Sequence, residues 1–269
     1  MVLERHHTSM SGPESGPTLV FAHGFGCDQR LWRWVAPAFD DRFRVVTFDY
    51  VGSGRSDASA YSEERYATLD GYADDALDLL EALDRGPVVW IGHSVSAMIG
   101  VAAAIRRPEA FSHLMLLCPS PYYLNDPPAY RGGFEREDIE GLLALMDKHP
   151  AGWAGFLAPL VMQNADRPEL GAELHDSFCA MEPRVARTFA KATFFGDSRG
   201  DLAKVRHPTL ILQCRVDPIA SPEVGRFVHD RIAGSRLVTL DATGHCPQVS
   251  HPGATIAAMD AYLRAEGWG

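Results

Sequence analysis

The most informative feature of the sequence is a serine placed where a strand-like run turns directly into a helix of small residues. Residues 88–91 are apolar and of strand-forming types, Gly92 follows them, and Ser94 comes two residues later. A helical segment of small residues starts at Ala97. This order is typical of a nucleophile elbow, a tight turn that lifts the serine hydroxyl out of the sheet. A serine held in this way can attack a carbonyl carbon if a base and an acid reach it.

The motif differs from its usual form at the last position, where Ser96 stands in place of glycine. Glycine there permits close packing of the helix against the strand. Serine adds only a hydroxymethyl group, so we expect the elbow to form. The alternative is that Ser94 merely caps the helix. The strand and helix on either side favour the elbow.

A histidine suited to the role of general base lies near the end of the chain. His245 follows the strand-like run at residues 236–240, and loops beyond strand ends are where a parallel sheet gathers its site residues. A neutral imidazole can accept the serine proton and later return it to a leaving group. The chain has 11 histidines, so the residue type alone means little. His93 should point away from the site at the elbow, and His23 should support a nearby loop.

Asp217 is the acid that we expect to orient this histidine. It follows the strand-like run at residues 208–214, and a carboxylate there can hold the imidazole in the required tautomer. Asp241 is an alternative only four residues before His245. The run at residues 113–118 is followed by proline and serine and no carboxylate, which favours Asp217. The order serine, aspartate, histidine is also the one that accompanies this elbow.

A glycine-flanked loop at residues 23–26 follows the first apolar strand. Such a loop can turn a backbone N–H into the site. We therefore predict an oxyanion hole formed by the backbone N–H groups of Phe25 and Val95, aimed at the charge that develops on a carbonyl oxygen.

These residues require a sheet that brings distant segments to one edge. Short apolar runs alternate with helical periods, which predicts an α/β fold with a mostly parallel sheet and helices on both faces. The expected strands are at residues 18–22, 43–49, 88–91, 113–118, 208–214 and 236–240, and the expected helices of this part at 69–83, 97–105 and 255–265. Two separate domains are less economical, because each half alone would hold an incomplete sheet.

The pattern changes between residues 121 and 199, where helical periods occur without a convincing strand. The expected helices there are at residues 135–149, 152–163, 167–181 and 183–195. We predict a core of residues 1–120 and 200–269 interrupted by a four-helix cap of residues 121–199. Aromatic residues in the cap occur at helical spacing, which core packing could explain. We expect Phe134, Phe156 and Phe194, together with Ile219, to line an apolar pocket over Ser94.

Composition excludes several classes of function. The chain has 269 residues with 46% hydrophobic residues, enough for a substantial core, and a net charge of −10, which disfavours nucleic acid or an anionic membrane as a partner. Its five cysteines are odd in number and lack CxxC spacing, which indicates reduced thiols and a cytoplasmic protein. No apolar run reaches membrane length. No metal-ligand spacing, phosphate-binding loop or complete dinucleotide fingerprint occurs, so we expect no metal and no cofactor.

Several short segments together resemble one known family. They are His-Gly-Phe-Gly-Cys-Asp-Gln at residues 23–29, Phe-Asp-Tyr-Val-Gly-Ser-Gly at 48–54, Thr-Leu-Asp-Gly-Tyr-Ala at 68–73, Gly-His-Ser-Val at 92–95, Pro-Ser-Pro at 119–121, Tyr-Leu-Asn-Asp at 123–126, Gly-Gly-Phe at 132–134 and Gly-His-Cys-Pro at 244–247. The chain resembles the RsbQ-like α/β hydrolases, bacterial proteins linked to a stress-response phosphatase. Plant karrikin and strigolactone receptors are similar but more distant. The family has a glycine where this chain has Ser96.

The resemblance runs nearly end to end and includes the cap. It implies an α/β-hydrolase fold under a four-helix cap, a triad of Ser94, Asp217 and His245, and a closed hydrophobic pocket for a small apolar ligand. It also implies a possible partner protein, a PAS-domain phosphatase.

Two functions follow as hypotheses. The first is a serine hydrolase that cleaves a small apolar ester, lactone or butenolide-like molecule. The second is a small-molecule receptor that cleaves its ligand slowly and acts with a partner phosphatase in a stress response. Both can hold together, since slow cleavage could itself be the signal.

Overall fold

A seven-stranded sheet organises the molecule. The computed structural model describes residues 1–268, and its strand order is β1-β3-β2-β4-β5-β6-β7. Only β1 runs antiparallel to its neighbour; the other strands pair in parallel, as the sequence predicts. The strands are β1 (Ser9–Ser11), β2 (Thr18–Ala22), β3 (Arg44–Thr47), β4 (Val88–His93), β5 (Phe111–Leu117), β6 (Thr209–Val216) and β7 (Arg236–Thr243).

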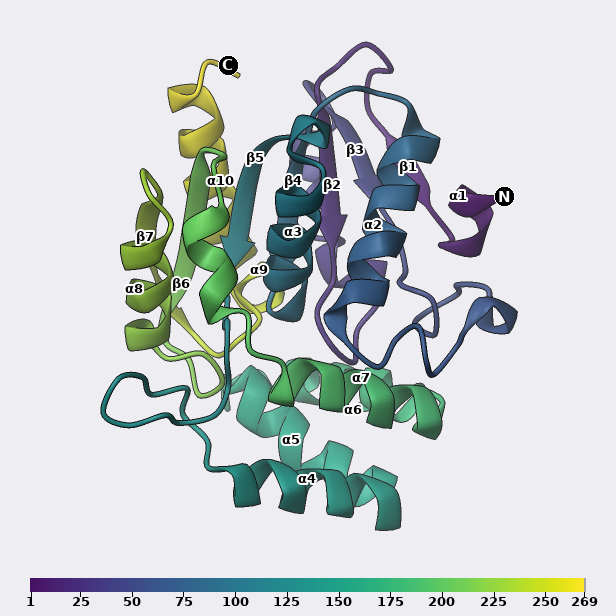
Figure 1. The fold of residues 1–269 in the computed structure, drawn as a ribbon, viewed down its shortest axis with the longest axis vertical. Coiled ribbons are helices and arrows are strands. Elements are labelled where there is room, and N and C mark those ends of the chain that lie inside the picture. The colour runs from purple at the N-terminus through teal and green to yellow at the C-terminus, as the bar shows by residue number, and fades with distance from the viewer. Residues whose placement is uncertain (269) are drawn as a thin grey trace.

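Helices cover both faces of this sheet. In Figure 1, α2 (Leu69–Leu83), α3 (Val95–Arg106) and α8 (Pro222–Arg231) lie on the near face, and α10 (Pro252–Ala265) lies on the far face. Successive side chains of a strand point to opposite faces. Leu19 and Phe21 of β2 accordingly enter one hydrophobic cluster, whereas Val20 and Ala22 enter the other. This double burial explains why the strand is a continuous apolar run rather than an alternating one.

Four further helices form a separate layer, which we call the cap. They are α4 (Arg136–Lys148), α5 (Pro150–Met162), α6 (Pro168–Cys179) and α7 (Pro183–Phe195), and they occur between β5 and β6 in the chain. Figure 1 shows this layer below the sheet, beyond the ends toward which the parallel strands run. Three of the helices begin with proline, whose missing N–H is not needed at the first helical position. The exact divisions at residues 121 and 199 stay a prediction.

Several short elements carry too little pattern to be predicted from the sequence. They are α1 (Val2–Arg5), β1, α9 (Pro247–Ser250) and 3₁₀ helices at Gln29–Trp32, Ala36–Phe39, Ala58–Ala60, Pro108–Ala110 and Arg199–Lys204. All three residues of β1 are exposed, so no apolar periodicity marks the strand. Helix α8 was also not predicted. Within residues 1–268, no helix combines the length and the apolar character that crossing a bilayer requires.

Candidate active site

The sharp turn after β4 gives Ser94 an unusual backbone conformation. Ser94 directly precedes α3 and has φ +57° and ψ −122°, which a residue with a side chain rarely adopts. Such conformations cost about 1–3 kcal/mol and persist where the surrounding structure enforces them. Gly92 permits the turn, because any side chain at this position would clash with the backbone: a Cβ atom would lie 2.3 Å from the carbonyl oxygen of Ser96. The first glycine of the motif, Gly92, is therefore required because no larger residue fits there.

The last position of the motif tolerates serine because its hydroxyl has partners. Ser96 is fully buried and donates a hydrogen bond to the carbonyl oxygen of His23. Its Oγ also lies 3.0 Å from the hydroxyl oxygen of Tyr50. A buried hydroxyl without such partners would destabilise the fold. Ser96 thus links the start of α3 to the loop that follows β2.

The three side chains predicted to act together meet at one point. His245, just beyond β7, places its Nε2 atom 2.8 Å from Ser94 Oγ. Its Nδ1 atom lies 2.8 Å from Oδ2 of Asp217, which directly follows β6. Oδ1 of Asp217 accepts hydrogen bonds from the backbone N–H groups of Ile219 (2.8 Å) and Ala220 (3.0 Å). The alternative acid, Asp241, has an 87% exposed side chain that pairs with Arg215 instead.

This arrangement fixes which nitrogen of His245 carries the proton. A carboxylate can only accept, so Nδ1 donates to Asp217 and Nε2 is left as the acceptor that faces the serine hydroxyl. All three side chains are nearly inaccessible to solvent. The Ser94 hydroxyl, the His245 imidazole and the Asp217 carboxylate thus form a hydrogen-bonded series of a hydroxyl, a base and an orienting acid. This arrangement is the one that activates a serine for attack on a carbonyl.

Tyr123 is a further polar neighbour of Ser94 that the sequence analysis did not identify as a site residue. Its hydroxyl oxygen lies 3.3 Å from Ser94 Oγ, and the side chain is buried. Burial raises the pKa of Tyr123 above its ordinary value, so the phenol stays protonated. Because the Ser94 proton is directed at His245, the Tyr123 hydroxyl is the donor to Ser94 Oγ. No spacing rule connects the two residues, and only the fold shows their proximity.

Two other buried histidines support the site through its backbone. Nδ1 of His23 donates to the carbonyl oxygen of Gly24 (2.9 Å), and its Nε2 accepts from the backbone N–H of Tyr50 (3.2 Å), so it supports the loop before Phe25 as predicted. Burial lowers the pKa of His23, which keeps it neutral.

His93 differs from its predicted role, because it does not simply point away from the site. Its Nε2 atom donates to the carbonyl oxygen of His245 at 2.8 Å, and it lines the pocket beside Ser94. Burial and the neighbouring His245 lower the pKa of His93 to about 3. His93 is therefore a neutral support for the backbone of the predicted base.

Comparison with known proteins places the chain in a family. The sequence model of the protein family described as "alpha/beta hydrolase fold" matches residues 17–252 of this chain. The chain belongs to the α/β hydrolase family. The karrikin insensitive 2 receptor CA of Petunia hybrida is 36% identical over 260 residues, which cover 96% of each protein. A strigolactone esterase of Arabidopsis thaliana is 39% identical over 235 residues, 87% of each protein.

A solved structure is similar over almost the entire hydrolase. A hydrolase from Oleispira antarctica superposes with a TM-score of 0.95 at 44% sequence identity, and the match covers 98% of this chain and 96% of that one. The relatives of this chain therefore include a plant protein named as an esterase as well as one named as a receptor.

The two residues predicted to supply the oxyanion hole are both close to Ser94, one next to it in the chain and one in the lining of the same pocket. Val95 is the first residue of α3, and the first N–H groups of a helix have no acceptor within it. Phe25 is in the loop after β2 and lines the same pocket as Ser94. The part that their N–H groups play stays a prediction.

The pocket over Ser94 is small and almost entirely apolar. Its volume is about 40 Å³. The predicted residues Phe134, Phe194 and Ile219 all line it. The other apolar residues that line it are Phe25, Cys27, Ile139, Leu142, Leu157, Val161, Leu174, Phe178 and Cys246. Thr193 also lines it, and its buried hydroxyl has no hydrogen-bond partner among residues 1–268.

The prediction for Phe156 is wrong. Its side chain is 57% exposed and lies outside this pocket. The inward face of α5 is formed by Trp153, Leu157 and Val161, which recur every four residues and are buried. Phe156 stands next to Leu157 in the sequence, and adjacent residues on a helix do not share a face.

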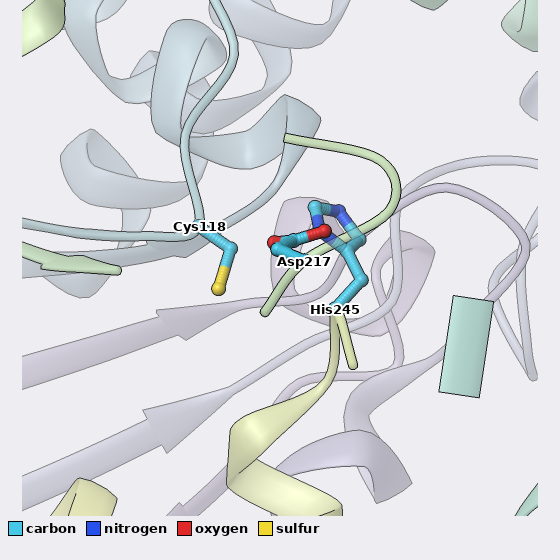
Figure 2. Close-up of side chains that lie close together, drawn as sticks. All are labelled: Cys118, Asp217 and His245. Carbon is cyan, nitrogen blue, oxygen red and sulfur yellow. The ribbon is translucent and has the colours of Figure 1, made fainter. Parts of the chain in front are cut away.

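Three potential metal ligands of the hydrolase also lie together, as Figure 2 shows. One ligand atom each of Cys118, Asp217 and His245 lies within 4.8 Å of the others. Nδ1 of His245 already donates a hydrogen bond to the carboxylate of Asp217. Burial and contact with Cys214 raise the pKa of the Cys118 thiol, which opposes the thiolate form that binds metals. This donor set therefore fits the serine–histidine–aspartate arrangement better than it fits a cation.

Proposed function

We propose that this α/β hydrolase cleaves a small, apolar ester or lactone, with Ser94 as nucleophile, His245 as general base and Asp217 as the acid that orients the base. The observation that carries the proposal is the continuous path of two 2.8 Å contacts from Ser94 through His245 to Asp217. The apolar lining of the pocket supports a substrate with little polar surface.

The reaction would proceed in two halves. Ser94 Oγ attacks the carbonyl carbon of the substrate while its proton passes to Nε2 of His245, and Asp217 stabilises the imidazolium that forms. The N–H groups of Phe25 and Val95 would hold the oxyanion. His245 then returns the proton to the leaving oxygen, which departs as an alcohol or as the opened end of a lactone. Water, deprotonated by His245, finally releases the acyl group from Ser94.

The test is steady-state hydrolysis of p-nitrophenyl acetate and of a simple butenolide by the purified protein and by Ser94→Ala. We expect a loss of about 10³-fold or more in kcat for the variant, because the substitution removes the nucleophile on which the acyl intermediate is proposed to form. Ser235→Ala is the matched control, since it removes a buried hydroxyl that bonds His229 of α8 and does not line the pocket. Equal turnover by wild type and Ser94→Ala would refute the proposal.

A second function, ligand reception with slow cleavage, is favoured by a specific observation. The petunia relative is named a karrikin insensitive receptor, and the Arabidopsis relative is named a strigolactone esterase. Together with the RsbQ-like resemblance, this supports a butenolide-like ligand and a partner such as a PAS-domain phosphatase. Single-turnover kinetics separates the two functions. A receptor would release one equivalent of product and then stall, whereas a metabolic enzyme would continue to turn over.

The cysteines support a cytoplasmic location as part of the proposal. All five are free, and four of them are buried. Buried, unpaired thiols are characteristic of a reducing compartment.

A further inference from the structure

The loop that carries His245 rests on the end of a cap helix. The backbone N–H of His245 donates to the carbonyl oxygen of Val161 in α5 at 2.9 Å. Gly244, with φ +94°, passes so close to the end of this helix that a Cβ atom would lie 2.2 Å from the carbonyl oxygen of Met162. The position of the imidazole is therefore set in part by the cap as well as by β7.

Asn164, just beyond the end of α5, forms further hydrogen bonds between the end of this helix and the loop that carries His245. Its Nδ2 atom donates to two carbonyl oxygens, that of Met162 in the cap (2.7 Å) and that of Thr243 at the end of β7 (2.8 Å). Thr243 lies only two residues before His245. The Asn164 backbone has φ +55°, a left-handed conformation that asparagine adopts more readily than most residues.

Arg167 completes the attachment and fixes the orientation of the asparagine. Its Nη2 atom donates to Oδ1 of Asn164 at 2.7 Å, which leaves the amide nitrogen facing the two carbonyl oxygens. Its Nη1 atom donates to the carbonyl oxygen of Ser250 at 2.6 Å. Two cap side chains therefore bond core backbone on both sides of His245 in the sequence.

We propose that Asn164 and Arg167 are positioning residues that clamp the end of α5 to the loop carrying His245, so that the cap sets the distance from the imidazole to Ser94. The inference rests on the proposed function, because it concerns the base of that reaction. Neither residue lines the pocket over Ser94, so neither contacts the substrate there. The clamp predicts that loosening this end of the cap lowers the rate of the chemical step and leaves substrate binding nearly unchanged.

The test compares Asn164→Asp and Asn164→Gly with the control Glu173→Gln. Aspartate keeps the shape of the side chain but removes both donors, and glycine keeps the backbone conformation without any side chain. Glu173 of α6 also joins cap to core, through an ion pair with Arg33 at 2.6 Å, but it does not touch the His245 loop. Each variant is measured with p-nitrophenyl acetate for kcat and KM. The downfield proton NMR signal of the His245 Nδ1–H, which donates a hydrogen bond to Asp217, is recorded without substrate.

For both Asn164 variants we expect kcat to fall about 10- to 100-fold, since a small misplacement of a catalytic group has effects of this size. We expect KM to change less than about threefold and the proton signal to broaden or shift. Glu173→Gln should keep both kcat and the signal of the wild type. Thermal unfolding of each variant shows whether it remains folded. Two different substitutions of Asn164 are used because one of them can be folded even if the other is not.

The inference is overturned if folded Asn164 variants keep the wild-type kcat and proton signal. It is also overturned if Glu173→Gln loses as much activity as they do, because any contact between cap and core would then suffice. Failure of the proposed function gives a different result, namely no Ser94-dependent turnover by the wild type. In that case the comparison of the His245 Nδ1–H signal between the wild type and the Asn164 variants still decides whether the clamp positions His245.

Discussion

The core and the cap build the two sides of the same pocket by different means. The core side carries the catalytic candidates, whose polar atoms are bonded to one another and to backbone: both ring nitrogens of His245 and both carboxylate oxygens of Asp217 have partners between 2.8 and 3.0 Å away. The cap side consists mostly of aromatic and aliphatic side chains, with the hydroxyl of Thr193 among them, around a space of about 40 Å³. Hydrogen bonds are directional, whereas apolar packing restricts volume.

We therefore expect the reaction rate and the choice of substrate to depend on different sides of the pocket. Substitutions on the core side should change the rate for every substrate alike. Substitutions on the cap side should change which substrates are accepted. The exception is the clamp at Asn164, where a cap residue bonds directly to the backbone on the core side.

The largest effect expected from this comparison concerns the buried acid. Asp217→Asn should lower kcat about 10³- to 10⁴-fold, because an amide can donate to Nδ1 and so favours the wrong imidazole tautomer. Asp241→Asn is the control, since that exposed carboxylate pairs only with Arg215. Kinetics with p-nitrophenyl acetate measures both. A loss in the Asp241 variant comparable to that in the Asp217 variant would mean that the acid is wrongly assigned.

A smaller effect should appear on the cap side as a change in selectivity. Phe194 lines the pocket and packs against Tyr123 with ring centroids 5.1 Å apart. Phe194→Ala should raise kcat/KM for p-nitrophenyl hexanoate relative to the acetate by about tenfold, since each methylene that a pocket accepts or rejects has effects of this size. The exposed Phe156→Ala should leave the ratio as it is. An unchanged ratio for Phe194→Ala would contradict the role given to the cap.

Tyr123 stands at the boundary between the two sides. Tyr123→Phe removes the hydroxyl that lies 3.3 Å from Ser94 Oγ, and kcat should fall about 5- to 10-fold, the worth of one ordinary hydrogen bond. Tyr130→Phe is matched to it, because that hydroxyl bonds the carbonyl oxygen of Tyr122 and not the serine. If both variants kept full activity, the Tyr123 hydroxyl would have no part in the reaction.

A last prediction concerns the pH dependence of stability rather than activity. The pKa of His93 in the folded protein is about 3, against 6.5 for the ordinary side chain. The unfolded chain therefore binds a proton that the folded one does not, and the free energy of unfolding should fall as the pH drops from about 6.5 toward 3. Urea denaturation at several pH values measures the slope, which His93→Gln should reduce. A steeper slope in that variant would contradict the assignment.

The sequence predicted the parts of the site that local pattern controls. Residues 18–22 and 69–83 form β2 and α2 with the expected bounds, because one is a continuous apolar run and the other has a clear helical period. Ser94, Asp217 and His245 each directly follow or lie just beyond a strand. Since parallel strands bring those ends to one edge, their meeting could be expected from the order of the elements.

The remaining features depend on contacts that no local pattern encodes. Helix α5 is apolar on most of its surface, so periodicity could not show that Phe156 faces outward. The bond from Asn164 to Thr243 joins residues 79 positions apart, and Tyr123 reaches Ser94 through a loop without regular structure. Such contacts follow from tertiary packing and become visible only in the folded chain.

In the proposed reaction, the Ser94 hydroxyl, activated by His245, forms a bond to the acyl group of a small ester or lactone. Intact-mass analysis after brief exposure to p-nitrophenyl acetate or a butenolide, followed by peptide mapping, tests it most directly. We expect a single acyl adduct on Ser94 that is absent in Ser94→Ala and forms far more slowly in His245→Ala. An adduct on another residue at the wild-type rate in Ser94→Ala would contradict it.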